Sequence, residues 1–114
     1  MATESNLREN RRSERVLIRV PIEVRGEAFD NTPFSGPGDT AVVSRHGALV
    51  LLPVRLKPDS QLTLTNKFSQ ETETFRVVWS AEKPKDGRYE SGIEALNPRD
   101  DFWGIRFPPA ARKA

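Results

Sequence analysis

The feature that most constrains this sequence is a series of short apolar segments in which apolar and polar side chains alternate. The clearest one runs from Val16 to Val24, where every second residue is Val or Ile. A period of two places alternate side chains on opposite faces of a β-strand, so this segment is predicted to be a half-buried strand. Pro21 lacks an N–H group and therefore favours an edge position or a bulge.

Further strands are predicted where similar runs recur between turn-forming residues. Residues 26–38 contain two prolines and three glycines and are predicted to form a long loop. Asp86-Gly87 is a strong hairpin signal. In the strand before it, Phe75, Val77 and Trp79 are expected to share one face. The remaining strands are expected at residues 40–44, 48–52, 62–65, 75–79 and 89–96.

These runs, without a long helical pattern, predict an all-β fold, either a small antiparallel barrel or a sandwich. Closure into a barrel removes the edges that short strands otherwise leave exposed. Asn97 and Pro98 resemble the start of a short C-terminal helical turn, with Phe102 and Trp103 on its apolar face. We expect a flexible basic N-terminal arm at 1–14, a barrel domain at 15–107 and a disordered tail at 108–114.

Composition argues against several classes of function. The 114 residues include no cysteine and one histidine, His46, which leaves no thiol nucleophile and no set of ligands at metal-binding spacing. A Gly-rich phosphate loop is also lacking. We therefore expect neither an enzyme nor a cofactor. No apolar run approaches the roughly 20 residues that cross a bilayer, so a cytoplasmic protein without membrane insertion is expected.

The first quarter of the chain is rich in arginine, although the formal net charge is only +2. Arg11, Arg12 and Arg15 immediately precede the first predicted strand. A guanidinium group can pair bidentately with phosphate or with the O6/N7 edge of guanine, and it can stack on a purine. The arginines therefore predict an anion-binding site, and the alternative is a solvated basic arm interleaved with glutamates.

A second candidate motif is the expected turn Ser44-Arg45-His46-Gly47. Glycine permits a positive φ, so the neighbouring backbone N–H groups can point outward toward an anion or a base. For His46 the alternative is an ordinary surface turn residue. Taken alone, this motif is compatible with any hairpin.

In this order and on this strand plan, the two motifs resemble the PilZ domain, a bacterial binding module for cyclic di-GMP built on a six-stranded β-barrel. Arg11 and Arg15 match its Arg-x-x-x-Arg motif, and Arg12 supplies the common doubled arginine. Ser44 and Gly47 match the later part of its Asp/Asn-x-Ser-x-x-Gly motif. The resemblance covers about residues 11–107.

The resemblance implies a six-stranded antiparallel barrel that acts as a receptor or adaptor in bacterial second-messenger signalling. Cyclic di-GMP would be the ligand, no other cofactor would be needed, and a downstream protein partner would sense its binding. Arg11 and Arg15 would contact guanine and phosphate, while Ser44 and Gly47 would shape the opposite wall. The implied ligand-binding residues are Arg11, Arg12, Arg15, Ser44, Arg45, His46 and Gly47.

Val42 occupies the position of the family's Asp or Asn. Valine makes no side-chain hydrogen bond, and the loss of one polar partner at a desolvated site costs about 1–3 kcal/mol. The alternative is thus a degenerate PilZ fold that binds no nucleotide and acts through protein–protein contacts. A third possibility, a small barrel for single-stranded nucleic acid, needs exposed aromatic side chains such as Tyr89 or Phe75.

Overall fold

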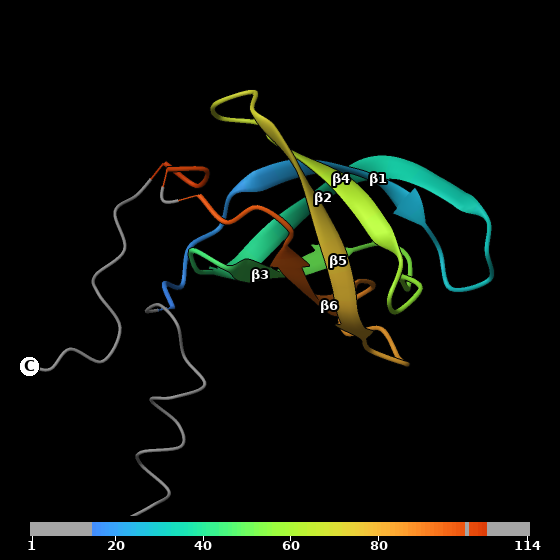
Figure 1. Cartoon of the computed structure of the whole chain (residues 1–114). Helices are drawn as coiled ribbons and strands as arrows, with labels where there is room; N and C mark the ends of the chain where they lie inside the picture. The colour runs from blue at the N-terminus through green and yellow to red at the C-terminus, as the bar shows by residue number, and fades with distance from the viewer. Residues whose placement is uncertain (1–14, 100, 105–114) are drawn as a thin grey trace, which may run out of the picture.

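A computed structural model describes residues 15–99 and 101–104 of the chain. Six antiparallel strands pair in the order β1-β2-β3-β6-β5-β4, and β4 pairs with β1 to close a barrel (Figure 1). The predicted six-stranded antiparallel β-barrel is therefore confirmed. The strands are β1 (Pro21–Glu27), β2 (Pro33–Val43), β3 (Gly47–Leu52), β4 (Gln61–Asn66), β5 (Thr72–Ser80) and β6 (Tyr89–Ala95).

The interior of the barrel is filled by side chains that point inward from alternate positions of the strands. Such filling is typical of small barrels, whose interior is just wide enough for their own side chains. Any ligand must consequently bind at a rim or on the outer surface. The buried core comprises Val20, Ile22, Val24, Val43, Val50, Leu52, Leu56, Leu62, Leu64, Phe75, Val77, Ile93, Phe102 and Trp103.

The long loop predicted over 26–38 is wrong, because β2 already begins at Pro33. From Pro33 to Gly38, β2 pairs with β1, and its pairing with β3 begins only at Asp39. On its other side this half of β2 has no hydrogen-bonded neighbouring strand. Prolines are tolerated at such an edge, because no partner needs their missing N–H. Glycine is needed at position 38, because a Cβ there would lie only 2.4 Å from the Cδ2 atom of Leu52.

The first regular strand begins at Pro21, later than the predicted Val16. Val16 instead forms an isolated bridge with Val43, in which each N–H donates to the other C=O at 2.9 Å. Thr40 then holds the chain before β1: its hydroxyl accepts the N–H of Val20 at 2.8 Å and donates to the C=O of Ile18 at 2.7 Å. The backbone N–H of Thr40 also donates to the C=O of Val20 at 3.1 Å. The chain therefore reaches the end of β2 before it enters the barrel.

The prediction that Phe75, Val77 and Trp79 share one face of the strand is wrong for Trp79. Val77 pairs with Ile93, but Trp79 pairs with Gly92, so β5 carries a bulge between these positions. A bulge adds one residue and reverses the alternation beyond it. Trp79 is consequently 45% exposed, whereas Phe75 and Val77 are buried.

The helical turn expected after Asn97 includes Asp100, which lies outside the described residues. Residues 101–104 form a single turn, in which the N–H of Gly104 donates to the C=O of Asp101 at 3.2 Å. The predicted arm at 1–14 and tail at 108–114 also fall outside the described part of the chain.

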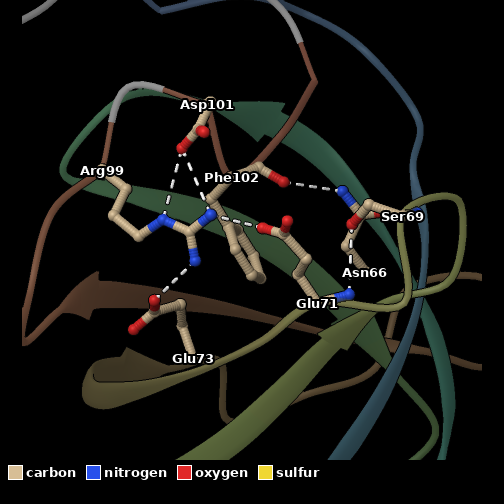
Figure 2. A network of polar contacts seen from close by, with 7 residues as sticks. All are labelled: Asn66, Ser69, Glu71, Glu73, Arg99, Asp101 and Phe102. Carbon is tan, nitrogen blue, oxygen red and sulfur yellow. Dashed lines mark hydrogen bonds and ion pairs between the residues drawn. The ribbon is translucent and has the colours of Figure 1, made fainter.

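Two aromatic side chains of this C-terminal turn close one end of the barrel. Phe102 and Trp103 are buried, and their ring centroids lie 5.8 Å and 6.2 Å from that of Phe75. The side-chain amide of Asn66 donates to the C=O of Phe102 at 2.8 Å (Figure 2). The C-terminal turn is thus part of the core.

Acidic residues on and near β5 hold the chain just before this turn. Figure 2 shows the guanidinium of Arg99 between Glu71, Glu73 and Asp101, and its Nη1 lies 2.8 Å from Glu73 Oε2. Hydrogen bonds to Glu73 and then to Glu71 raise the pKa of Arg99. The guanidinium therefore stays charged at every physiological pH.

Candidate functional site

A cleft of about 660 Å³ opens at the barrel end where Val16 pairs with Val43. Its walls come from the chain entering the barrel, from the β2–β3 turn, and from the bulged part of β5 with the end of β6. The lining comprises Arg15, residues 42–44 and 46–49, Val78, Trp79, residues 92–96 and Pro98.

The structure brings together part of the set of ligand-binding residues predicted from the sequence. Arg45 is exposed and lies outside the lining. Arg11 and Arg12 lie outside the described residues. Those that line the cleft are Arg15, Ser44, His46 and Gly47.

The bridge between Val16 and Val43 positions Arg15. Because Val16 and Val43 pair antiparallel, Arg15 stands beside the start of the turn at Ser44. Its side chain is exposed, and it forms no ion pair with another residue of the described chain. The guanidinium is therefore available at the rim of the cleft.

The turn at 44–47 is held by hydrogen bonds on several sides. The hydroxyl of Ser44 accepts the N–H of Gly47 at 3.2 Å, and the N–H of Ser44 donates to the C=O of Gly47 at 2.8 Å. The C=O of His46 accepts the N–H of Ala95 at 2.7 Å, and the C=O of Ser44 accepts the indole N–H of Trp103 at 3.1 Å. The Ser44 side chain thus shapes the turn.

The reason predicted for Gly47, a positive φ, is wrong. Among the described glycines, only Gly87 and Gly104 have a positive φ. A Cβ at Gly47 would instead lie 2.2 Å from the carbonyl oxygen of Ile93. Glycine is needed here because β3 and β6 approach each other closely.

Trp79 is a residue of the cleft that sequence reasoning missed. Its indole lies against the β6 backbone, where a Cβ at Gly92 would be 2.3 Å from its Nε1. With Val42, Val78 and Leu96 it forms an apolar wall. An exposed indole face is a stacking surface for a flat aromatic ligand. Alternation alone assigns Trp79 to the core, and no signal in the sequence marks the bulge.

Replacing Gly92 by alanine is expected to displace the Trp79 ring, because the new methyl group would overlap it. Overpacking of this kind costs about 1–3 kcal/mol. In an amide NMR spectrum the indole N–H signal of Trp79 is expected to shift, while that of Trp103 serves as the internal control. Unchanged signals for both indoles would contradict this packing.

The charge of the cleft is set by few groups. Arg15 is the only Lys or Arg, and Glu94 the only acid, among the lining residues that the structure describes. Glu94 accepts a hydrogen bond from the Nε atom of Arg76 at 2.9 Å and forms an ion pair with its Nη2 atom at 2.9 Å. Arg76 also pairs with Asp59 at 2.7 Å. Arg76 is thus shared between two carboxylates, and Arg15 supplies the positive charge among the described lining residues.

Within residues 15–99 and 101–104, no group of three or more His, Cys, Asp or Glu side chains is placed to hold a metal ion. The same residues contain no helix long and apolar enough to cross a membrane.

No protein-family model and no curated protein matches this sequence. A function can therefore be proposed only from the chemistry of the cleft and from the resemblance of the two motifs. The groups that bear on the choice are a guanidinium at the rim, an apolar wall with one exposed indole, and a tightly bonded turn.

Proposed function

We propose that this chain is a PilZ-type receptor or adaptor that binds cyclic di-GMP in the cleft beside the 44–47 turn. The observation that carries the proposal is the bridge between Val16 and Val43. It brings Arg15, the end of the first motif, to the turn that forms the second motif. Two sequence motifs that are far apart along the chain thereby meet at one cleft.

The chemistry of the cleft suits a cyclic dinucleotide, which carries two phosphates and two flat bases. Arg15 pairs with a phosphate, and Arg11 and Arg12 add positive charge from the preceding segment. A base stacks on the exposed indole of Trp79. The volume of about 660 Å³ falls within the range of roughly 300–1,000 Å³ that is usual for small-ligand sites.

Signalling would follow from the surface that the bound ligand creates beside the barrel. The ligand is held by Arg11, Arg12 and Arg15, and the altered surface is then read by a downstream protein. In this proposal the protein performs no chemistry on its ligand and acts in the bacterial cytoplasm.

Titration calorimetry with cyclic di-GMP tests the proposal. Arg15→Ala is expected to weaken binding by about 10–100-fold, because a hydrogen bond to a charged group contributes about 1.5–3 kcal/mol. Arg25→Ala is the matched control, since Arg25 is an exposed arginine of β1 outside the cleft. Absence of heat with the wild-type chain at high ligand concentration would refute the proposal, as would an equal loss with Arg25→Ala.

A second candidate function is a protein-interaction module without a nucleotide ligand. It is favoured by Val42, which lines the cleft where the family motif has Asp or Asn, and by the exposed side chains of Val78 and Trp79. An apolar protein segment would then occupy the cleft. Partner capture that is equal with and without cyclic di-GMP, together with unchanged amide spectra on adding it, would support this candidate.

Single-stranded nucleic acid has weaker support. Phe75, one of the aromatic residues that such a surface would need, is 2% exposed and packs against Phe102. Tyr89 is half-buried. The pair therefore offers no continuous platform for successive bases, which binding of this kind requires.

A further inference from the structure

We propose that the barrel end opposite the cleft is a docking surface for an acidic segment of a partner protein, anchored by Phe29 and Arg55. Two connections form this surface, residues 28–32 between β1 and β2 and residues 53–57 after β3. Because β1 and β3 both end there, the surface lies away from the 44–47 turn (Figure 1). The inference goes beyond the proposed function and does not depend on which ligand occupies the cleft.

The side chain of Arg55 is held against an exposed aromatic ring. Its guanidinium carbon lies 3.6 Å from the centroid of the Phe29 ring, and Phe29 is 47% exposed. A cation in this position is attracted by the electrons of the ring. The Nε atom of Arg55 is buried and has no hydrogen-bond partner among the described residues. Stacking on Phe29, rather than an ion pair within the described chain, therefore fixes this guanidinium.

Backbone hydrogen bonds hold the two connections together. Ala28 forms an isolated bridge with Leu56, and the N–H of Phe29 donates to the C=O of Arg55 at 2.8 Å. The turn itself is closed by the N–H of Ala28, which donates to the C=O of Thr32 at 2.8 Å. Both anchors are thus in place before a partner arrives. A surface organised in this way loses little conformational entropy on binding.

An exposed phenyl ring beside a guanidinium is suited to contact with a protein. Aromatic residues and arginine are enriched at protein–protein interfaces and among the residues that contribute most to binding. Phe29 offers apolar contact area, and Arg55 offers a planar set of donors that matches a carboxylate bidentately. A guanidinium has donors only, so the group that it binds must be an acceptor.

The charges around Phe29 favour an acidic partner. Arg55 stacks on the ring, and the ammonium of Lys57 donates to the side-chain oxygen of Asn31 in the same turn. The acid of this turn, Asp30, accepts two hydrogen bonds within the turn and pairs with neither cation. Carboxylates of a partner therefore meet two cations here, and an apolar side chain between them covers the exposed ring.

A titration with short peptides, followed in the amide NMR spectrum, tests the proposal. The probe is acetyl-Glu-Leu-Glu-Leu-amide, and the control peptide has glutamine in place of each glutamate, at the same ionic strength. The acidic peptide is expected to shift the amide signals of residues 28–32 and 55–57, with a dissociation constant of about 1 mM. The neutral peptide is expected to bind about tenfold more weakly or less.

Three variants locate the anchors. Arg55→Gln is expected to weaken binding of the acidic peptide by about 10–100-fold, because it removes a charged hydrogen-bond donor. Phe29→Ser is expected to weaken it by about 5–30-fold through loss of the apolar contact. Arg19→Gln is the matched control, since Arg19 is an exposed arginine that precedes β1 at the cleft end. It is expected to leave peptide binding unchanged.

Absence of shifts at these amides would overturn the proposal, as would equal binding of the acidic and neutral peptides. An equal loss in Arg19→Gln and Arg55→Gln would also overturn it, because net charge alone would then attract the peptide. Calorimetry with cyclic di-GMP keeps the two proposals apart. Arg55→Gln is expected to leave cyclic di-GMP binding unchanged, so either the docking surface or the proposed function can fail without the other.

Discussion

Replacement of Trp103 by alanine is expected to lower the free energy of unfolding by about 3–5 kcal/mol, the usual cost of truncating a buried tryptophan. Trp103 is 4% exposed and meets the Phe102 ring edge-on at a centroid distance of 4.9 Å. Its truncation opens a cavity at the end of the barrel. It also removes the indole donor from the carbonyl of Ser44, so the turn beside the cleft loses one of its supports.

Urea denaturation followed by circular dichroism measures this effect. Trp103→Phe is the matched comparison, because it keeps an aromatic ring in the core and removes the hydrogen bond to Ser44. Its cost is expected to be smaller, about 1–3 kcal/mol. A loss below about 1 kcal/mol for Trp103→Ala would show that the C-terminal turn does not belong to the core.

The free energies of ion pairing and of apolar burial can be compared to find what holds the C-terminal segment in place. Arg99 has three acidic neighbours, but its side chain and that of Asp101 are accessible to water, which screens their attraction. Exposed ion pairs contribute little to stability. Burial of Phe102 and Trp103 therefore supplies most of the attachment, and Arg99 fixes its direction.

Much of the barrel follows from local sequence patterns. The alternating runs place most strands, and Asp86-Gly87 forms the predicted hairpin turn, with φ angles of 55° and 81° at these residues. The first half of β2 could not be recognised in this way, because Pro33 and Gly38 are typical loop residues. They form a strand here only because β1 pairs with them on one side and Leu52 packs closely against Gly38.

The candidate site was predictable where the resemblance points to it and not where it depends on packing. That Arg15 and the 44–47 turn belong to one site followed from the resemblance. The outward position of Trp79 did not, because the bulge is set by pairing with β6 rather than by the sequence of β5. The close approach that requires Gly47 likewise involves Ile93, which is distant in the sequence.

Replacement of Gly47 by alanine is expected to lower the free energy of unfolding by about 3 kcal/mol, at the upper end of the range for overpacking. The new Cβ would lie 2.2 Å from the carbonyl oxygen of Ile93, whereas an ordinary contact is about 3.5 Å. Relief requires β3 and β6 to separate, because the obstacle is backbone rather than a side chain. Separation also strains the bond from the Ala95 N–H to the His46 C=O, which supports the turn beside the cleft.

Gly36→Ala provides the matched control, since it is the same substitution at a strand position whose nearest neighbour is a side chain. A Cβ there would lie 3.1 Å from the ring of Phe34, which is partly exposed and can move aside. Its cost is expected to stay below about 1 kcal/mol. Urea denaturation of both variants, with hydrogen exchange at the Ala95 amide, measures the difference. Equal costs would mean that β3 and β6 do not approach as closely as described, and Gly47 would then have no structural reason to be glycine.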